Sequence, residues 1–338
     1  MQSAIGGALV AQSQLSQASA LIVAAGIDFA VGDPWGWPHP VQGMGKLIEA
    51  YSHWALKRSR SVLAMRTVGI GLAATVIGSS AAVSWIGLAL LGAVSPWLRL
   101  GGECILLASC FAGRSLRRAA EEVLLPLSAG DYKTARQTLA KYVGRDTDQL
   151  SVTEIYRAVL ETVSENATDG VFAPLFYAIL GGFVGLAGPA AIAYKAASTL
   201  DSMVGYRREP YTHLGWFSAR LEDALTWLPC RISVLTVALL SGRPIYVLRQ
   251  CHRDARADPS PNAGWSECAY AAALGVQLGG TNLYQGKAIA KPLLGEALQP
   301  ITSAVVKRAF AITRRGFIAG LALGTFGLYC FYCFYRVS

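Results

Sequence analysis

Charged side chains are scarce in this sequence. Asp, Glu, Lys and Arg together make up 15% of the 338 residues, whereas a typical soluble domain carries about 25%. Hydrophobic residues reach 53%, so the composition argues against an ordinary soluble protein and indicates an integral membrane protein. The net charge is +9, but the basic residues are spread over many loops. Because no helix-turn-helix, zinc-finger or RNA-binding motif accompanies them, they are better explained as residues flanking membrane spans than as a nucleic-acid interface.

The sequence also lacks the motifs of several common catalytic sites. It has no GxxxxGK[ST] loop and no HExxH, GxSxG or EF-hand pattern. Its four histidines are scattered, so a histidine metal site is a weak expectation. The seven cysteines lie mostly in apolar context without regular spacing, which argues against a disulfide framework. Cys330 and Cys333 form a C-x-x-C within an aromatic run and are interpreted as apolar packing residues.

Long apolar runs predict the fold class. Residues 68–94 are 27 consecutive positions without a charge, which is enough for a transmembrane helix. Residues 232–240 are too few to span alone, whereas about 20 apolar residues follow the basic pair at 314–315. We therefore expect an all-α integral membrane protein, a bundle of transmembrane and re-entrant helices with a helical cytoplasmic loop region. The expected parts are a flexible N-terminal lead-in (1–17), a membrane domain that holds the site (18–312) with a cytosolic helical region at 114–170, and a C-terminal transmembrane anchor (313–338).

Basic loops predict the orientation. Lys and Arg concentrate in 32–66 and in 114–170, and such loops favour the cytoplasmic side. The sequence therefore predicts a multi-pass protein of the cytoplasmic (inner) membrane with its active face toward the cytoplasm.

The region 114–170 contains clear helix signals. Asp131 is a predicted N-cap, and Ser151 with Glu154 forms a capping-box pattern. Glu154, Glu161 and Glu165 follow one face of the second helix, which is expected to stop at the SENATDG segment. A solvated acidic face with an ion pair is the commoner reading of such a stripe, and it stays open beside the functional one.

An apolar stretch at 171–193 separates two polar clusters. Prolines and glycines interrupt it, so we expect two short helices that turn near Gly181 and Gly182 and return both clusters to one side of the membrane. A single straight helix, the alternative, would place the clusters on opposite sides.

Acidic, amide, hydroxyl and cationic side chains gather in four segments of an otherwise apolar chain. Carboxylates with nearby cations suit a Mg²⁺–phosphate site, acyl activation by ATP, or binding of a charged amphipathic ligand. The candidates are Asp28, Asp33 and His39 in the first segment; Glu165, Asn166 and Asp169 in the second; Lys195, Ser198, Asp201, Tyr206 and Arg207 in the third; and Arg220, Glu222 and Asp223 in the fourth.

These segments carry long motifs. They read D-x-x-x-G-D-P with P-H-P-V (28–41), SENxxDGxxAPLFY (164–177), YKAxxTLDSMVGY (194–206) and ARLEDxxxxxPxR (219–231), followed by an NAGW…ALGVxLGG…YxG pattern (262–286). In this order the motifs resemble the CobD/CbiB family of cobalamin-biosynthesis membrane proteins, over residues 20–310. Departures are Glu222 where the family pattern has Asp, Thr226 where it has Asn, and Ser266 where it has Pro.

The resemblance implies a reaction. Members join (R)-1-aminopropan-2-ol, or its O-phosphate, to adenosylcobyric acid through an amide bond, giving adenosylcobinamide or its phosphate, and they consume ATP. It implies ATP and Mg²⁺ and no tightly bound prosthetic group. The implied partners are the corrinoid substrate, the aminopropanol unit, the lipid bilayer and other late cobalamin-pathway enzymes, with no nucleic acid.

Carried onto this sequence, the resemblance assigns roles to the candidates. The catalytic residues would be Glu165, Asp169, Lys195, Asp201 and Arg207; the substrate-binding residues Asp28, His39, Asn166, Ser198, Tyr206, Arg220, Glu222 and Asp223; and the Mg²⁺ ligands Asp33, Asp169 and Asp201. Two alternatives stay open from the sequence, a membrane sensor or scaffold that binds a ligand without chemistry, and a corrinoid transporter.

Overall fold

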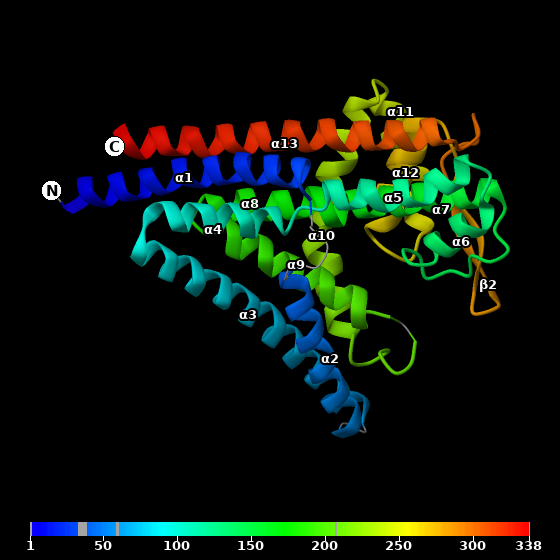
Figure 1. Cartoon of the computed structure of the whole chain (residues 1–338), viewed down its shortest axis with the longest axis horizontal. Coiled ribbons are helices and arrows are strands. Elements are labelled where there is room, and N and C mark those ends of the chain that lie inside the picture. The colour runs from blue at the N-terminus through cyan, green and yellow to red at the C-terminus, as the bar shows by residue number, and fades with distance from the viewer. Residues whose placement is uncertain (1, 33–38, 59–60, 207, 338) are drawn as a thin grey trace. The chain divides into compact units, whose positions relative to one another are not determined.

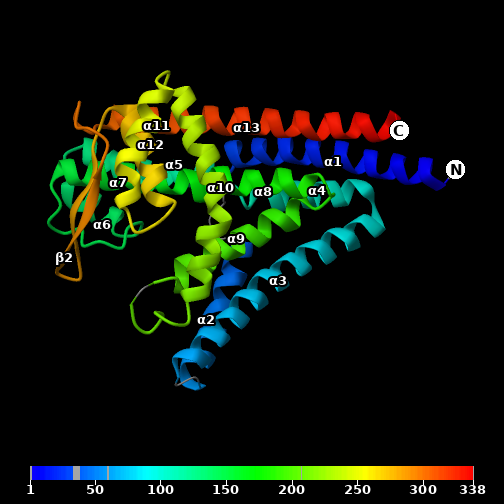
Figure 2. The same ribbon diagram turned by 180° about the vertical axis from the view of Figure 1, so that it is seen from behind.

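The computed structural model describes residues 2–32, 39–58, 61–206 and 208–337, which are mostly helical. Figures 1 and 2 show the elements from two opposite sides. The chain divides into two compact units. Unit 1 comprises Met1–Ala112, Ala173–Leu225 and Ala319–Ser338, and unit 2 comprises Gly113–Phe172 and Thr226–Ile318. The divisions between units fall within α10 (Trp216–Leu240) and α13 (Ser303–Val337).

Unit 1 is built from helices. They are α1 (Gln2–Ala30), α2 (Pro40–Arg58), α3 (Val62–Val94), α4 (Pro96–Ala108), α8 (Ala173–Gly182), α9 (Ala187–Val204), the first part of α10 and the last part of α13. α9 packs against α2, α3 and α8, while α1 packs along α4. The motifs of the first and third polar segments belong to this unit, as do residues 219–225 of the fourth.

Two buried polar side chains, Gln17 and Glu103, fix the start of α9. The amide of Ala187 donates to Gln17 Oε1 at 3.0 Å, and the amide of Gly188 donates to Glu103 Oε1 at 3.3 Å. Gln17 Nε2 also donates to Glu103 Oε2 at 2.8 Å. Because the first amides of a helix have no partner within it, these side chains from α1 and α4 satisfy them. They therefore set the position of the helix that carries the third polar segment.

Unit 2 combines helices with one small sheet. Its elements are α5 (Gly113–Ser128), α6 (Tyr132–Leu139), α7 (Val152–Ala167), η1 (Thr168–Phe172), the rest of α10, α11 (Pro244–Asp254), η2 (Ala255–Ala257), α12 (Ala263–Leu274), β1 (Leu278–Tyr284), β2 (Lys287–Leu294) and the first part of α13. One buried apolar cluster draws side chains from α5, α6, α7, α10, α11, α12 and α13. The second polar segment, on α7 and η1, lies against this core.

The mostly helical structure agrees with the expected fold class, and the antiparallel hairpin of β1 and β2 is an exception to it among the described residues. The strands pair from Leu278 with Leu294 to Tyr284 with Lys287. At the turn, Gln285 and Gly286 have φ of 52° and 75°, as in the two-residue turns that join hairpin strands. Gly279 has φ of 84°, a conformation that a helix does not contain and that glycine adopts without strain. These two strands were not predicted from the sequence.

Three helix limits also differ from expectation. Residues 2–17, expected as a lead-in loop, belong to α1. The SENATDG segment does not stop α7, because the π-helical turn η1 continues it. Residues 232–240 are the end of the 25-residue helix α10, so they are not a separate short segment. In the last two cases the sequence signal was local, whereas packing and hydrogen bonds from other elements support the longer helix.

Other expectations are confirmed. Asp131 caps α6 by accepting the Thr134 amide at 3.0 Å, and Ser151 with Glu154 forms the capping box of α7. The stretch 171–193 is broken into α8 and α9, which pack as a helical hairpin. Its re-entry into a membrane, and the cytoplasmic placement of 114–170, stay predictions.

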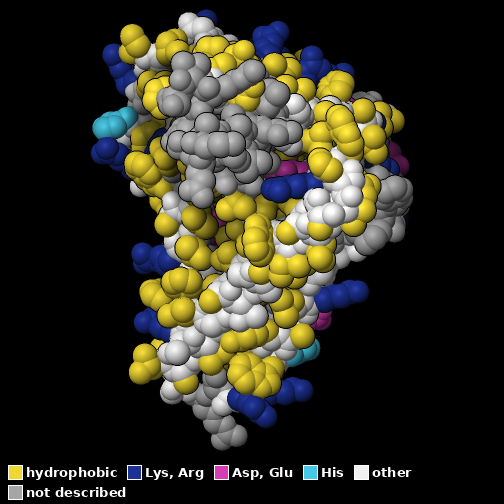
Figure 3. Space-filling view, turned by 90° about the vertical axis from the view of Figure 1, so that its left-hand side faces the viewer, with side chains coloured by type: hydrophobic (Ala, Val, Ile, Leu, Met, Phe, Trp, Pro, Cys, Tyr) yellow, Lys and Arg dark blue, Asp and Glu magenta, His cyan; other side chains and the backbone are white. Residues whose placement is uncertain are grey.

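Three helices among the described residues are long and apolar enough to cross a bilayer. They are Val62–Val94, Trp216–Leu240 and Ser303–Phe334. Several large hydrophobic side chains of α3 and α4 are exposed, including Leu63, Val94 and Trp97 at 75%, 76% and 80%. In Figure 3 hydrophobic side chains cover much of the face that is shown. Such exposure is typical of a surface in contact with lipid rather than water.

Candidate functional site

Glu161 on α7 lies in a buried network in which both of its carboxylate oxygens accept hydrogen bonds. Its carboxylate accepts from Arg145 Nη2 at 2.5 Å and from the Gly279 amide at 2.9 Å, and Arg157 Nη1 lies 3.7 Å away. Both arginines also donate to Asn282 Oδ1 at 3.0 Å. The side chains of Arg145 and Glu161 are only 7% and 3% exposed. The network therefore ties α7 to β1, and we assign Glu161 a positioning role.

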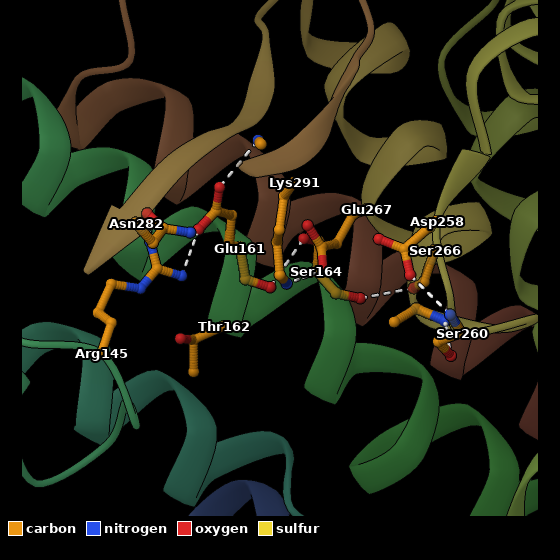
Figure 4. Close-up of polar contacts among 12 residues, drawn as sticks. Arg145, Glu161, Thr162, Ser164, Asp258, Ser260, Ser266, Glu267, Asn282 and Lys291 are labelled. Atoms are coloured by element: carbon orange, nitrogen blue, oxygen red, sulfur yellow. Dashed lines mark hydrogen bonds and ion pairs between the residues drawn. The ribbon is translucent and has the colours of Figure 1, made fainter. Parts of the chain in front are cut away.

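A second group of charged side chains, from α7, α12 and β2, is less completely paired. Glu267 on α12 is 1% exposed, and neither of its carboxylate oxygens accepts a hydrogen bond. Lys291 on β2 places its Nζ 3.9 Å from Glu267 Oε1. Figure 4 shows the Lys291 side chain extending toward Glu267 beside Glu161. Glu165, half-buried on α7, interacts electrostatically with the same lysine. Glu165, Glu267 and Lys291 form the acid–lysine cluster.

Burial changes the proton affinity of this cluster. Burial raises the pKa of Glu267 well above its ordinary value; Lys291 opposes this increase and Glu165 adds to it. The pKa of Glu165 is also raised by burial, against the effect of Lys291. Burial lowers the pKa of Lys291, but Glu267 and Glu165 outweigh it, so that pKa is raised. Two carboxylates sharing one cation therefore retain a proton more strongly than free carboxylates do.

The π-helical turn η1 is held by hydroxyl groups. Thr168 Oγ1 lies 2.7 Å from Ser266 Oγ and 3.0 Å from Ser233 Oγ, and Ser266 Oγ donates to the Ser164 carbonyl at 2.6 Å. These bonds connect the end of α7 to α10 and α12 within unit 2. Because π-helical turns are rare and often mark functional positions, the placement of Asp169 on η1 supports its candidacy. Asp169 itself is half-buried.

Asn166 differs from its neighbours. Its side chain is exposed, and its Nδ2 donates to the Thr162 carbonyl of its own helix at 2.9 Å. This contact is local, so the structure gives no separate indication of a role in binding substrate.

The remaining described candidates belong to unit 1. Asp28, at the end of α1, is 7% exposed, and Glu222 on α10 is 9% exposed. His39 accepts the Val41 amide through Nδ1 at 3.2 Å, at the start of α2. The rest are half-buried or exposed: Lys195, Ser198 and Asp201 on α9, Asp223 on α10, and the exposed Tyr206 and Arg220. Lys195 and Ser198 are three residues apart, so they lie on one side of α9.

Comparison with known proteins identifies the family. Residues 21–313 match the family described as CobD/Cbib protein. The chain belongs to the CobD/CbiB family. It is 52% identical over 300 residues to the cobalamin biosynthesis protein CobD of Synechocystis sp., covering 88% of each chain. It is 41% identical over 301 residues to CbiB of Salmonella arizonae, covering 88% of this chain and 93% of the relative. No solved structure matches the chain.

Membership of the CobD/CbiB family makes this chain a cobalamin-biosynthesis protein with membrane character.

One departure from the family motifs has a structural consequence. At position 266 the pattern has Pro, which has no hydroxyl group, whereas here Ser266 donates to the Ser164 carbonyl. Ser266 thereby supports the turn that carries Asp169.

The predicted Mg²⁺ site stays a prediction. Asp33 and Arg207 lie outside the described residues, while Asp169 belongs to unit 2 and Asp201 to unit 1. Within the described ranges, no three His, Cys, Asp or Glu side chains come together as metal ligands. Carboxylate oxygens suit Mg²⁺ in kind, but the described residues alone do not assemble its site.

The sequence reasoning missed Glu267 and Lys291 as site residues. Glu267 stands alone in the small apolar segment GWSECAYAAALG, and Lys291 follows AIA in a strand. An isolated charge in an apolar run is costly to bury unless it is paired, and this signal could have identified both residues. The sequence alone could not predict that they pair, because they lie on different elements and each is more than 100 residues from Glu165.

Proposed function

We propose that this chain is an amide-forming ligase. It joins (R)-1-aminopropan-2-ol, or its O-phosphate, to the free propionate of adenosylcobyric acid, consumes ATP, and yields adenosylcobinamide or its phosphate. Family membership and the four motifs support this reaction. The proposal places the protein in the inner membrane with its active face toward the cytoplasm, where ATP and the corrinoid are available.

The proposed chemistry has two steps. A propionate oxygen attacks the terminal phosphorus of ATP and ADP leaves, which gives an acyl phosphate. The amine nitrogen then attacks the acyl carbon, and inorganic phosphate leaves as the C–O bond breaks. An aliphatic amine is protonated at neutral pH, because its pKa is near that of lysine, about 10.4. A base at the site must therefore accept a proton from this nitrogen before attack.

The acid–lysine cluster is the observation that carries the proposal. A general base is most effective when its pKa lies near the working pH, and burial moves the pKa of Glu267 upward. Its two oxygens accept no hydrogen bond in this structure, so they can receive an ammonium N–H. Lys291 compensates the negative charge when no amine is bound.

The other assigned residues complete the proposal. Glu165 acts with Glu267, and the cations Lys195 and Arg207 stabilise charge on the phosphoryl group. Asp169 and Asp201 are the remaining proposed catalytic residues. The proposed substrate contacts are Asp28, His39, Asn166, Ser198, Tyr206, Arg220, Glu222 and Asp223.

Coupling assays on the full chain in proteoliposomes test the reaction. With ATP, adenosylcobyric acid and aminopropanol phosphate, we expect an amide product by mass spectrometry. Glu267→Gln, which keeps the side-chain size, should lower turnover by about 10²- to 10⁴-fold. The matched control is Glu122→Gln, which alters a carboxylate of α5 in the same unit whose side chain is 33% exposed.

Three results would contradict the proposal. Full turnover by Glu267→Gln would show that Glu267 is not the general base. Corrinoid binding without any coupling would favour a sensor. Uptake of labelled corrinoid into sealed vesicles without ATP would favour a transporter.

A further inference from the structure

A basic groove lies between α5 and the first part of α13, both in unit 2. Its volume is about 590 Å³, within the range of roughly 300–1,000 Å³ that ligand pockets occupy. Among the twelve described residues that line it, four are basic and one is acidic. They are Arg117, Lys307, Arg314 and Arg315 against Glu121. The groove therefore favours an anionic ligand, and neither the family motifs nor the acid–lysine cluster includes these residues.

Helical periodicity explains why the basic side chains converge. The lining residues of α13 fall at 303, 306, 307, 310, 311, 314 and 315, and those of α5 at 117, 121, 124, 125 and 128. Both series repeat at intervals of three and four, so each defines one face of its helix. Buried Leu124, Val306 and Phe310 form the floor, and the Arg117 guanidinium lies 5.9 Å from the centre of the Phe310 ring. The basic side chains thus surround an apolar base.

The position along α13 indicates the source of the anion. Immediately after Arg315 the helix continues as an apolar stretch, and Ser303–Phe334 is one of the candidate membrane spans. Basic residues at the end of a span lie at the level of lipid headgroups, where pockets of Lys and Arg bind anionic lipids. Leu125, 68% exposed at the groove, offers apolar surface beside the cations. Charge and apolar surface together match a lipid phosphate with its acyl chain.

We propose that this groove binds the phosphodiester headgroup of an anionic phospholipid. An anionic phospholipid and a nucleotide both carry a phosphate group, which is the chemistry that the basic side chains would recognise. However, the lining consists of side chains from two helices and contains no glycine, whereas backbone amides of glycine-rich turns are the usual cradle for nucleotide phosphates. The site is independent of the proposed ligase chemistry and would anchor unit 2 at the membrane surface.

Binding measurements on the full chain in neutral detergent test this site. The groove variant is K307Q/R314Q/R315Q. The matched control is R249Q/R256Q/R308Q, which removes the same charge from exposed positions of unit 2 outside the groove. The probes are short-chain phosphatidylglycerol, phosphatidylcholine, ATP and inorganic phosphate. Thermal unfolding without lipid establishes that both variants fold.

We expect the wild type and the control to bind phosphatidylglycerol with similar affinity. Neither should bind phosphatidylcholine. The groove variant should bind about 100-fold more weakly, since each cation near a lipid surface contributes about fivefold. Equal weakening in the control would show diffuse charge instead of a site. Unchanged binding in the groove variant would overturn the proposal. Competition by ATP, lost in the groove variant, would reassign the groove to a nucleotide.

Discussion

Replacing Glu161 with alanine should destabilise the β1–β2 hairpin more than any other part of unit 2. The carboxylate is the shared acceptor for Arg145 and the Gly279 amide, and it lies 3.7 Å from Arg157. Without it, Arg145 keeps only its bond to Asn282 within this network. A buried cation then loses its counter-charge at the point where α7 meets the hairpin.

The expected size follows from burial. Removing one partner of a buried ion pair costs about 3–5 kcal/mol, because the remaining charge stays desolvated. Arg145 and Glu161 are 7% and 3% exposed, so little of this cost is relieved by water. By contrast, the Arg118–Glu122 pair has side chains 56% and 33% exposed, and pairs of that kind contribute only about 0.3–0.5 kcal/mol.

Hydrogen exchange followed by mass spectrometry measures this difference locally. In Glu161→Ala, peptides covering 278–294 should exchange roughly 10²- to 10⁴-fold faster, because the free energy of local opening falls by about 3–5 kcal/mol. Peptides from α3 should not change. Glu122→Ala serves as the control and should leave the hairpin within about twofold of wild type. Hairpin exchange that is equal in the two variants would refute the assignment of Glu161 as the link between α7 and β1.

Two more predictions concern the same unit. Since the pKa of Glu267 is raised in the folded state, its stabilising effect is present at low pH and is lost as the pH rises through the folded pKa. Between about pH 5 and about pH 8, the midpoint temperature of thermal unfolding should therefore fall more steeply with pH for the wild type than for Glu267→Gln. Parallel curves of midpoint against pH would contradict the raised pKa. Gly279→Ala should destabilise unit 2 strongly, because its φ is 84° and a Cβ would overlap the Pro292 carbonyl. In Gly286→Ala, with φ of 75° and open space around the Cβ, the cost should be only about 1–2 kcal/mol, and equal unfolding midpoints for the two variants would argue against the overlap.

Local signals in the sequence were reliable where only neighbouring residues decide the structure. Asp131 and the Ser151–Glu154 capping box begin α6 and α7 as expected, because a cap satisfies amides within three residues of itself. The same kind of signal failed at SENATDG. There the preference of Asn, Asp and Gly for stopping a helix is outweighed by bonds from Thr168 to Ser233 and Ser266, which are 65 and 98 residues away.

The candidate site shows a similar division. Motif reasoning selected Glu165 and Asp169 as candidates, because their neighbours along the chain carry a long pattern. It did not find Glu267 or Lys291, whose importance depends on burial against each other and on the charge of Glu165. No spacing along the chain encodes such a pairing, because α12 and β2 come into contact only in the tertiary structure.

By itself, the sequence determined the family, the membrane character and the capped helix starts, since these depend on composition, on long motifs and on contacts within a few residues. Only the tertiary structure decided the β1–β2 hairpin, the uninterrupted helix α10, the Glu161 network and the acid–lysine cluster. Each of these depends on free energies of burial and pairing between residues distant in sequence, and those energies exist only once the chain has packed.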